Sequence, residues 1–182
     1  LGYWFNFLQS KRNPSENDSM ENSYLGPKFS ETEIKKQLDL SEAKYSVHSY
    51  DEISDIVASD LADSNAVGWF CGRAEFGPRA LGSRSILADP RDPNMQKNLN
   101  LKIKFRESFR PFAPVVLEEK AEQWFDMTFK KSPYMMFVHK VKENKLIEKK
   151  EKNKFSSLEK VNEVRSQIPA VTHIDNSARI QT

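Results

Sequence analysis

Apolar residues recur at helical spacing in two stretches of the first third of the chain. In residues 30–38 the apolar positions share one face, and Ser30 and Glu33 have the spacing of a capping box, in which each side chain binds the other residue's backbone N–H. In residues 51–62 four apolar side chains follow the same period and are expected to be buried: Ile53, Ile56, Val57 and Leu61. Both segments are predicted to be packing helices without a chemical role.

Short runs rich in β-branched and aromatic residues predict strands along the rest of the chain. The expected strands are residues 66–71, 85–88, 112–117, 134–141, 171–174 and 178–180. Two further helices are predicted at 92–101, where Asp92 precedes a proline, and at 118–125, where acidic residues open the first turn. Strands and helices intermix without a strict βαβ repeat. The pattern predicts an α/β (α+β) fold with a twisted mixed sheet and flanking helices.

Two polar segments divide the chain. Residues 1–25 combine a short apolar run with an Asn/Ser/Glu-rich stretch, and we interpret them as the tail of a preceding domain and a linker. Residues 26–182 form one domain, interrupted at 140–167 by a charged insertion loop; eight lysines fall within 140–160. The chain begins without methionine and ends within a strand-like run at 178–182, so we expect it to be truncated at both ends.

Composition limits the classes of function. The chain has 182 residues, 38% of them apolar and 30% charged, and its net charge of +2 is too small to favour nucleic acid as a partner. The single cysteine, Cys71, excludes an internal disulfide and suits a reducing, cytoplasmic location. No apolar run reaches the ~18 residues of a membrane helix, so no membrane partner is expected. The dispersed histidines have no metal-ligand spacing, and no transition-metal site is expected.

The candidate chemistry is concentrated in residues 72–114, GRAEFGPRALGSRSILADPRDPNMQKNLNLKIKFRESFRPFAP. Six of the nine arginines lie in this block: Arg73, Arg79, Arg84, Arg91, Arg106 and Arg110. Four of the six glycines lie at or just before its start, and glycine lets a ligand approach the main chain closely. Arginine matches phosphate and carboxylate in a two-point geometry, whereas lysine is a mobile point charge. The block is therefore predicted to form an oxyanion site.

Cations alternate with apolar residues directly after the helix predicted at 92–101. On a strand, Lys102, Lys104 and Arg106 would share one face and form a basic strip on an apolar floor. Each charge-assisted hydrogen bond contributes about 1.5–3 kcal/mol, so a few such bonds suffice to hold a triphosphate. The alternative is that the cations of this segment form surface salt bridges, which contribute little, with three acidic neighbours: Glu107, Glu118 and Glu119.

In four long motifs the chain resembles the carboxy-terminal domain of the O-carbamoyltransferase family, which includes nodulation-factor and antibiotic carbamoyltransferases. The motifs are GRAEFGPRALGSRSILADPR, NLNLKIKFRESFRPFAPVVLEE, SPYMMFV and IPAVTHIDNSARIQT. The resemblance runs from about Gly26 to Thr182. It implies a YrdC-like α/β fold for residues 26–182 and an actin-like N-terminal domain of the same protein before it.

The resemblance also implies a two-step reaction. The YrdC-like domain uses ATP, with Mg²⁺, and carbamoyl phosphate to make carbamoyl-adenylate. The actin-like domain then transfers the carbamoyl group to a hydroxyl of a small-molecule acceptor, and the family's iron site belongs to that domain. The chain is accordingly expected to be part of an enzyme, a carbamoyltransferase, whose full reaction needs the preceding domain.

By the match of motifs, the resemblance implies roles for individual residues. Four would act in catalysis by holding phosphate: Arg79, Arg84, Lys104 and Arg106. Eight more would bind substrate or nucleotide: Arg73, Ser83, Ser85, Lys102, Arg110, His173, Asn176 and Arg179. Glu75 would orient one of the arginines or help to hold Mg²⁺. Where the family commonly has Asp-Gly-Thr, this chain has Asp175-Asn176-Ser177, in which Asn tolerates the left-handed turn and Ser keeps the hydroxyl.

Alternatives stay open for one residue and for the function as a whole. His173 lies two residues before Asp175, which suits a general base, but a structural histidine fits the pattern equally well. The alternative function is a basic YrdC-like module that binds RNA or nucleotide without catalysis, with phenylalanines among the cations stacking on bases. A third is an interaction domain that has lost catalysis. No Walker P-loop is present, so any nucleotide is held by side-chain cations.

Overall fold

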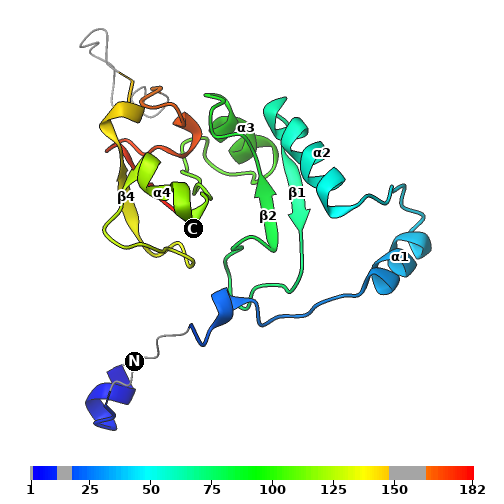
Figure 1. The fold of residues 1–182 in the computed structure, drawn as a ribbon, viewed down its shortest axis with the longest axis horizontal. Helices are drawn as coiled ribbons and strands as arrows, with labels where there is room; N and C mark the ends of the chain where they lie inside the picture. Colours follow the sequence, from blue (N-terminus) through cyan, green and yellow to red (C-terminus); the bar gives the residue numbers. More distant parts are fainter. Residues whose placement is uncertain (1, 12–17, 148–162) are drawn as a thin grey trace.

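The computed structural model describes residues 2–11, 18–147 and 163–182 (Figure 1). Its helices are α1 (Glu31–Leu40), α2 (Tyr50–Ala62), α3 (Met95–Lys102) and α4 (Glu118–Trp124). Its strands are β1 (Val67–Phe70), β2 (Arg84–Leu87), β3 (Phe125–Asp126), β4 (Val138–Val141) and β5 (Ser177–Arg179). Short π or 3-10 segments cover Tyr3–Phe7, Glu21–Ser23, Glu143–Lys145 and Pro169–Val171.

The described strands form two small antiparallel sheets, and the mixed α/β class expected from the sequence is confirmed. β1 pairs with β2 in the register Val67↔Leu87, and β3, β4 and β5 pair in that order. The strands therefore lie in two sheets rather than in one mixed sheet. An isolated parallel bridge joins Val115 to Gln181, just beyond the end of β5.

The first two helices form as predicted, but their apolar faces stay largely uncovered. Capping boxes close the N-termini of both helices, at Ser30 with Glu33 and at Ser49 with Glu52. In α2, none of the four apolar side chains that we expected to be buried is fully buried, and Ile56 is 41% exposed. Figure 1 shows α1 at the edge of the molecule, away from both sheets. Caps and local hydrogen bonds specify a helix, whereas burial needs a partner surface.

Several predicted strands are shorter than expected or absent. Of residues 112–117, only Val115 makes a β-bridge, and 134–141 is a strand only from Val138 onward. The strand predicted at 171–174 is wrong, because Pro169 opens a 3-10 turn there, which ends at Val171. The helix predicted at 92–101 starts later, at Met95, because the Asp92 carboxylate accepts from the Asn94 N–H at 2.8 Å in a local turn before it.

The basic strip expected over residues 102–106 requires a strand there, and the structure has none in this segment. Lys102 is the last residue of α3, and the chain then turns through Phe105, whose φ is +48°. Lys102, Lys104 and Arg106 consequently do not lie on a strand, and the expected basic strip with a common face does not form. The helix continues through Lys102 because Ile103 and Lys104 donate their N–H groups to the Leu99 carbonyl, in place of partners in a sheet.

Within the charged insertion expected at 140–167, backbone hydrogen bonds join the segment before residue 148 to the segment after residue 162. Residues 148–162 lie outside the described residues. On either side of them, an antiparallel bridge joins Leu146 to Ser166, and the Ile147 N–H donates to the Arg165 carbonyl at 2.9 Å. The backbone at the base of this insertion is therefore held in place next to the second sheet.

The buried core lies between the second sheet and the C-terminal segment. One cluster joins six side chains: Phe125, Val141, Ile168, Val171, Ala178 and Ile180. A smaller one consists of Met95, Leu99 and Ala170, and the half-buried Phe112 packs against both clusters. Core packing thus connects α3, which follows the first sheet, to the segment that carries β5.

Phe125 is the largest of the fully buried side chains among the described residues. Phe125→Ala removes its packing and leaves a cavity, so it should lower the free energy of unfolding by about 3–5 kcal/mol. The matched control is Val138→Ala, which truncates a side chain that is 56% exposed on the neighbouring strand and should cost no more than about 0.5 kcal/mol. Urea unfolding followed by circular dichroism measures both, and equal losses would contradict this description of the core.

Candidate oxyanion site

The site is built around a short loop that carries Arg79. Residues 77–82, here called the Arg79 loop, connect the turn after β1 to β2. The loop is bounded by Gly77 and Gly82, whose φ angles of +129° and +118° are strained for any residue with a side chain. The two glycines thus allow the turn that places Arg79, an exposed residue, at its outer side.

A buried carboxylate and the arginine that it pairs with hold the two ends of this loop. Oε1 of Glu75 accepts the N–H of Leu81 at 2.6 Å and that of Ser83 at 2.7 Å, and Oε2 accepts Nε of Arg84 at 2.8 Å. Nη2 of Arg84 donates in turn to the carbonyls of Glu75, at 2.9 Å, and of Gly77, at 3.3 Å. The Glu75 side chain is fully buried, while that of Arg84 is 39% exposed.

Burial by itself raises the pKa of Glu75, but the hydrogen bonds from Arg84 and from the backbone N–H groups outweigh it and lower the pKa to about 2. The carboxylate is therefore charged throughout the physiological range. Because the folded pKa lies below the usual value, the stability from this group is present above about pH 4.5 and is lost as the pH falls towards 2.

The Arg79 loop is joined to the far end of the chain. The carbonyl of Leu81 accepts hydrogen bonds from the Tyr24 hydroxyl at 2.7 Å and from Nε2 of Gln181 at 2.6 Å. Gln181 follows β5, on which the half-buried Arg179 lies. Burial and the positive charge of Arg79 lower the pKa of Arg179. The fold therefore brings two arginines a hundred positions apart within electrostatic range, and no carboxylate of the described residues forms a salt bridge with either.

A tight turn lies next to this arginine pair. Asn176 adopts a left-handed φ of +61°, and the Ser177 hydroxyl donates to Asp175 at 2.6 Å and lies 3.3 Å from Nδ1 of His173. The Asp175 carboxylate also forms a 3.4 Å ion pair with Lys140. The carboxylate is thus bound to Ser177 and Lys140 rather than to the imidazole. Burial and the charge of Arg179 lower the pKa of His173 more than Asp175 raises it, which favours a neutral ring.

Other predicted site residues are engaged with the protein itself. Arg106 donates Nε to the buried Asn100 at 2.5 Å and lies over the Phe112 ring, 4.9 Å from its centroid. Arg110 forms an exposed ion pair with Glu107 at 2.7 Å, which is the surface bridge considered as the alternative in the sequence. Arg106 is therefore a partly exposed cation that Asn100 and Phe112 hold in place. The charge of Arg110 is balanced by Glu107.

The remaining predicted residues are spread over the surroundings of the loop. Arg73 donates to the Gly26 carbonyl at 2.7 Å, and the Ser85 hydroxyl accepts the Gly82 N–H at 3.2 Å. Ser83 is buried with its N–H on Glu75. Lys102 and Lys104 are exposed at the end of α3 and just after it. The sequence predicted that Glu75 would orient one of the arginines or help to hold Mg²⁺, and the structure shows it bound to Arg84, whereas Tyr24 and Gln181 were not predicted to belong to the site. For those two residues the sequence contains no signal, because their contacts to Leu81 span 57 and 100 positions.

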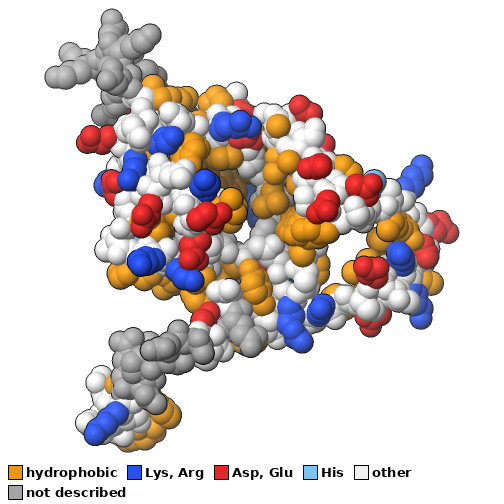
Figure 2. Space-filling view, viewed as in Figure 1, with side chains coloured by type: hydrophobic (Ala, Val, Ile, Leu, Met, Phe, Trp, Pro, Cys, Tyr) orange, Lys and Arg blue, Asp and Glu red, His pale blue; other side chains and the backbone are white. Residues whose placement is uncertain are grey.

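One face of the molecule is hollowed. In Figure 2 a depression separates the half that carries α4 and β4 from the half that carries β1 and β2, with apolar side chains along its edges. A cavity of about 250 Å³ lies where α3 meets the C-terminal segment, lined by Gln96, Phe109, Pro111, Ala170, Thr172, His173 and Ile174. His173 therefore contributes to this cavity and to the electrostatic environment of Arg179.

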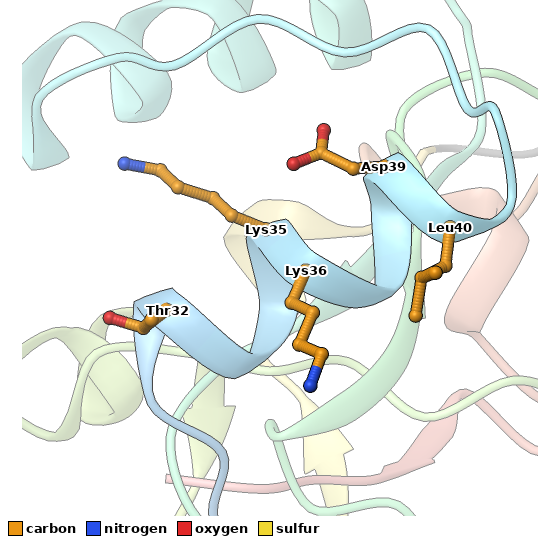
Figure 3. A pocket seen from close by; sticks show the side chains of 5 residues that line it. All are labelled: Thr32, Lys35, Lys36, Asp39 and Leu40. Atoms are coloured by element: carbon orange, nitrogen blue, oxygen red, sulfur yellow. The ribbon is translucent and has the colours of Figure 1, made fainter.

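A hollow beside α1 does not form a comparable site. It is lined by Thr32, Lys35, Lys36, Asp39 and Leu40, all from one helix. Figure 3 shows these side chains extending in different directions from the helix, so they do not converge on a ligand. Among the described residues no three His, Cys, Asp or Glu side chains are grouped as a metal site. Glu75 in particular uses both oxygens for Arg84 and backbone N–H groups and does not fit the Mg²⁺ role considered for it.

Known proteins are similar to this chain along most of its length. Residues 58–182 match the family model described as carbamoyltransferase C-terminus. An uncharacterized protein of Synechocystis is 50% identical over 185 residues, which cover 100% of this chain and 30% of the relative. Nodulation protein NolNO of Sinorhizobium fredii is 36% identical over 91% of this chain and 22% of its own length.

Nodulation protein U of Azorhizobium caulinodans is 41% identical over 72% of this chain and 20% of its own length. The chain thus spans less than a third of the length of these curated relatives. In the described part of the chain, the helices lack the length and apolar character needed to cross a membrane.

The electrostatic arrangement around His173 is testable by titration. We expect a pKa below the usual 6.5, because the ring is partly buried next to Arg179. Asp175→Asn should lower the pKa further, and Arg179→Gln should raise it, since each removes a charge that acts on the imidazole. Nuclear magnetic resonance of the imidazole C–H protons gives the three values. A pKa that neither variant changes would mean that these charges do not reach the ring.

Proposed function

Because the chain belongs to the carbamoyltransferase family, with residues 58–182 forming its C-terminal domain, we propose that it binds ATP and carbamoyl phosphate and forms carbamoyl-adenylate. The observation that carries this proposal is that the charge of Arg79 acts on Arg179, although the two residues come from distant segments of the chain, and that neither forms a salt bridge with a carboxylate of the described residues. Two like charges held near each other repel, and an anion between them removes that cost. Phosphate oxygens fit two guanidinium groups in the two-point geometry that arginine favours.

The proposed step suits such a pair of cations. In the proposed step, water first cleaves carbamoyl phosphate into carbamate and inorganic phosphate. A carbamate oxygen then bonds to the α-phosphorus of ATP as the bond to pyrophosphate breaks, so negative charge is redistributed over phosphate oxygens as the bonds change. Guanidinium groups already in position stabilise that charge without further reorganisation. Arg106, held against Phe112 and Asn100, and the exposed Lys104 lie on the segment that follows α3, and we propose that they add to the positive field. Mg²⁺ would arrive bound to the nucleotide's phosphates.

The cavity next to His173 suits the base of the nucleotide. Its walls include the aromatic ring of Phe109, the ring of Pro111 and the side chain of Ile174, and such apolar walls with a few polar groups are typical of ligand pockets. A neutral His173 adds a flat ring without a competing charge.

The second half of the reaction belongs to the whole protein. The curated relatives are more than three times longer than the matched segment, and we propose that the actin-like domain of the same protein, with its iron site, transfers the carbamoyl group to the hydroxyl acceptor. His173 is the nearest candidate for a base here, but its carboxylate neighbour is bound to Ser177 and Lys140, which leaves no His–Asp pair for proton transfer.

One observation favours a second candidate function. Phe105 is 84% exposed between Lys104 and Arg106, an arrangement that would let a base of single-stranded RNA stack on an aromatic ring beside cations. Polynucleotide binding would weaken steeply as salt rises, in proportion to the number of phosphates contacted. A nucleotide confined to the Arg79 and Arg179 pair would show a much shallower dependence.

The phosphate assignment predicts a specific pattern of affinities. Arg79→Ala and Arg179→Ala should each weaken ATP and inorganic tripolyphosphate about ten- to a hundredfold, since a lost charge-assisted hydrogen bond costs about 1.5–3 kcal/mol. Phe109→Ala should weaken ATP alone, because tripolyphosphate has no base. Lys35→Ala on α1 removes one exposed charge far from the site and is the matched control. Isothermal calorimetry measures all five proteins, and equal effects of the Arg79 and Lys35 variants would rule out the assignment.

A conservative substitution separates geometry from charge. If Arg79 binds phosphate through two N–H groups, Arg79→Lys should weaken tripolyphosphate nearly as much as Arg79→Ala, although the charge is kept. Arg110→Lys is the control, because its guanidinium is occupied by Glu107 in an exposed pair. Wild-type affinity in the Arg79→Lys protein would show that the residue acts only through its charge.

A further inference from the structure

We propose that Glu75 is a positioning residue for the anion site, and that Arg84 serves Glu75 rather than the ligand. This inference rests on the proposed function only in naming phosphate as the ligand. Its basis is the contact set of one fully buried carboxylate, whose two oxygens are bound by three backbone N–H groups and one guanidinium.

Backbone N–H groups at the end of the loop form an anion-binding concavity, and the carboxylate of Glu75 occupies it. The N–H groups of Leu81, Ser83 and Arg84 converge on Oε1 of Glu75, at 2.6, 2.7 and 3.3 Å. Successive N–H groups that converge in this way often bind phosphate. Here the carboxylate occupies the position, so a ligand phosphate is excluded from it and must bind on the outer side of the loop, where Arg79 is exposed.

Glu75 and Arg84 together hold both ends of the Arg79 loop. The carboxylate binds the N–H groups at the end of the loop, at Leu81 and just after it, while Nη2 of Arg84 binds the carbonyl of Gly77 at its start. The positive φ angles of Gly77 and Gly82 are maintained between these contacts. Removing either member of the pair frees one end of the loop.

The same loop is linked to the strand that carries Arg179. Gln181 donates a hydrogen bond to the carbonyl of Leu81, and the N–H of the same residue donates to Glu75. Glu75 therefore sets where Arg79 lies relative to Arg179. The arrangement explains why an acidic residue is placed within a block of arginines that should bind anions.

The sign of the effect distinguishes positioning from bulk electrostatics. Glu75→Gln removes a negative charge beside an anion site, so a purely electrostatic role would strengthen anion binding. If Glu75 positions the loop, the substitution must instead weaken binding, because Gln cannot accept the Arg84 Nε–H at its amide nitrogen. Glu107→Gln removes an exposed carboxylate from the same block and is the matched control.

The experiment measures tripolyphosphate and ATP binding by calorimetry in the wild-type chain, in the single variants Glu75→Gln, Arg84→Lys, Arg79→Ala and Glu107→Gln, and in the double variant Glu75→Gln/Arg79→Ala. We expect about tenfold weaker binding for Glu75→Gln and for Arg84→Lys, and no weakening for Glu107→Gln. In the Arg79→Ala background, Glu75→Gln should have no further effect, since Glu75 acts through Arg79. A merely structural defect would lower affinity in both backgrounds.

Amide hydrogen exchange provides a readout that needs no ligand. The Leu81 and Ser83 N–H groups should exchange faster in Glu75→Gln and in Arg84→Lys, while N–H groups of β3 to β5 keep their wild-type rates. Equal or tighter tripolyphosphate binding by a folded Glu75→Gln protein, or unchanged exchange at Leu81 and Ser83, would overturn the positioning role. If the wild-type chain bound neither anion, the proposed function would fail, and the exchange rates would still decide whether Glu75 holds the loop.

Discussion

Glu75 carries a negative charge into the interior of the protein, and the arrangement of the candidate site depends on how that charge is compensated. A buried carboxylate is costly unless hydrogen bonds and an opposite charge surround it. Here Arg84 and the loop N–H groups supply both, and the pKa falls to about 2 in spite of burial. The interaction constrains the backbone from residue 75 to residue 84, which is the segment that presents Arg79.

The site also depends on packing between distant parts of the chain. Phe112 contacts both core clusters, one below the second sheet and one beneath α3. Ala170 belongs to the smaller cluster and also lines the cavity next to His173. The packing of Phe112 thus connects α3 to the second sheet, and the half of the molecule that carries β1 and β2 faces the half that carries α4 and β4 across the depression seen in Figure 2. A ligand there would contact side chains from both halves.

Several arginines of the dense block at 72–114 pair with a nearby acidic residue instead of facing a ligand. Of the arginines in residues 72–114, Arg84, Arg91 and Arg110 each form an ion pair with a nearby acid, and Arg106 is held by Asn100 and Phe112. A dense run of arginines therefore does not imply that all of them face a ligand. Arg79 of this block and Arg179 of β5 come from different elements, and neither forms a salt bridge with a carboxylate of the described residues.

The sequence by itself determined the features that depend on neighbouring residues: the capping boxes of α1 and α2, the strands on either side of the Arg79 loop and the left-handed turn at Asn176. The capping boxes and the turn rest on hydrogen bonds or backbone angles within a few positions, and the two strands rest on short runs of residues that favour extended backbone. The motifs also pointed to the family. Only the tertiary structure decided which cations are balanced, because Glu75 and Arg84 bind each other across a loop and Arg179 approaches Arg79 across a hundred positions. The alternation at 102–106 misled for the same reason: a period of two indicates a strand only if another strand is available to pair with it, and here α3 ends at Lys102 and the chain then turns through Phe105.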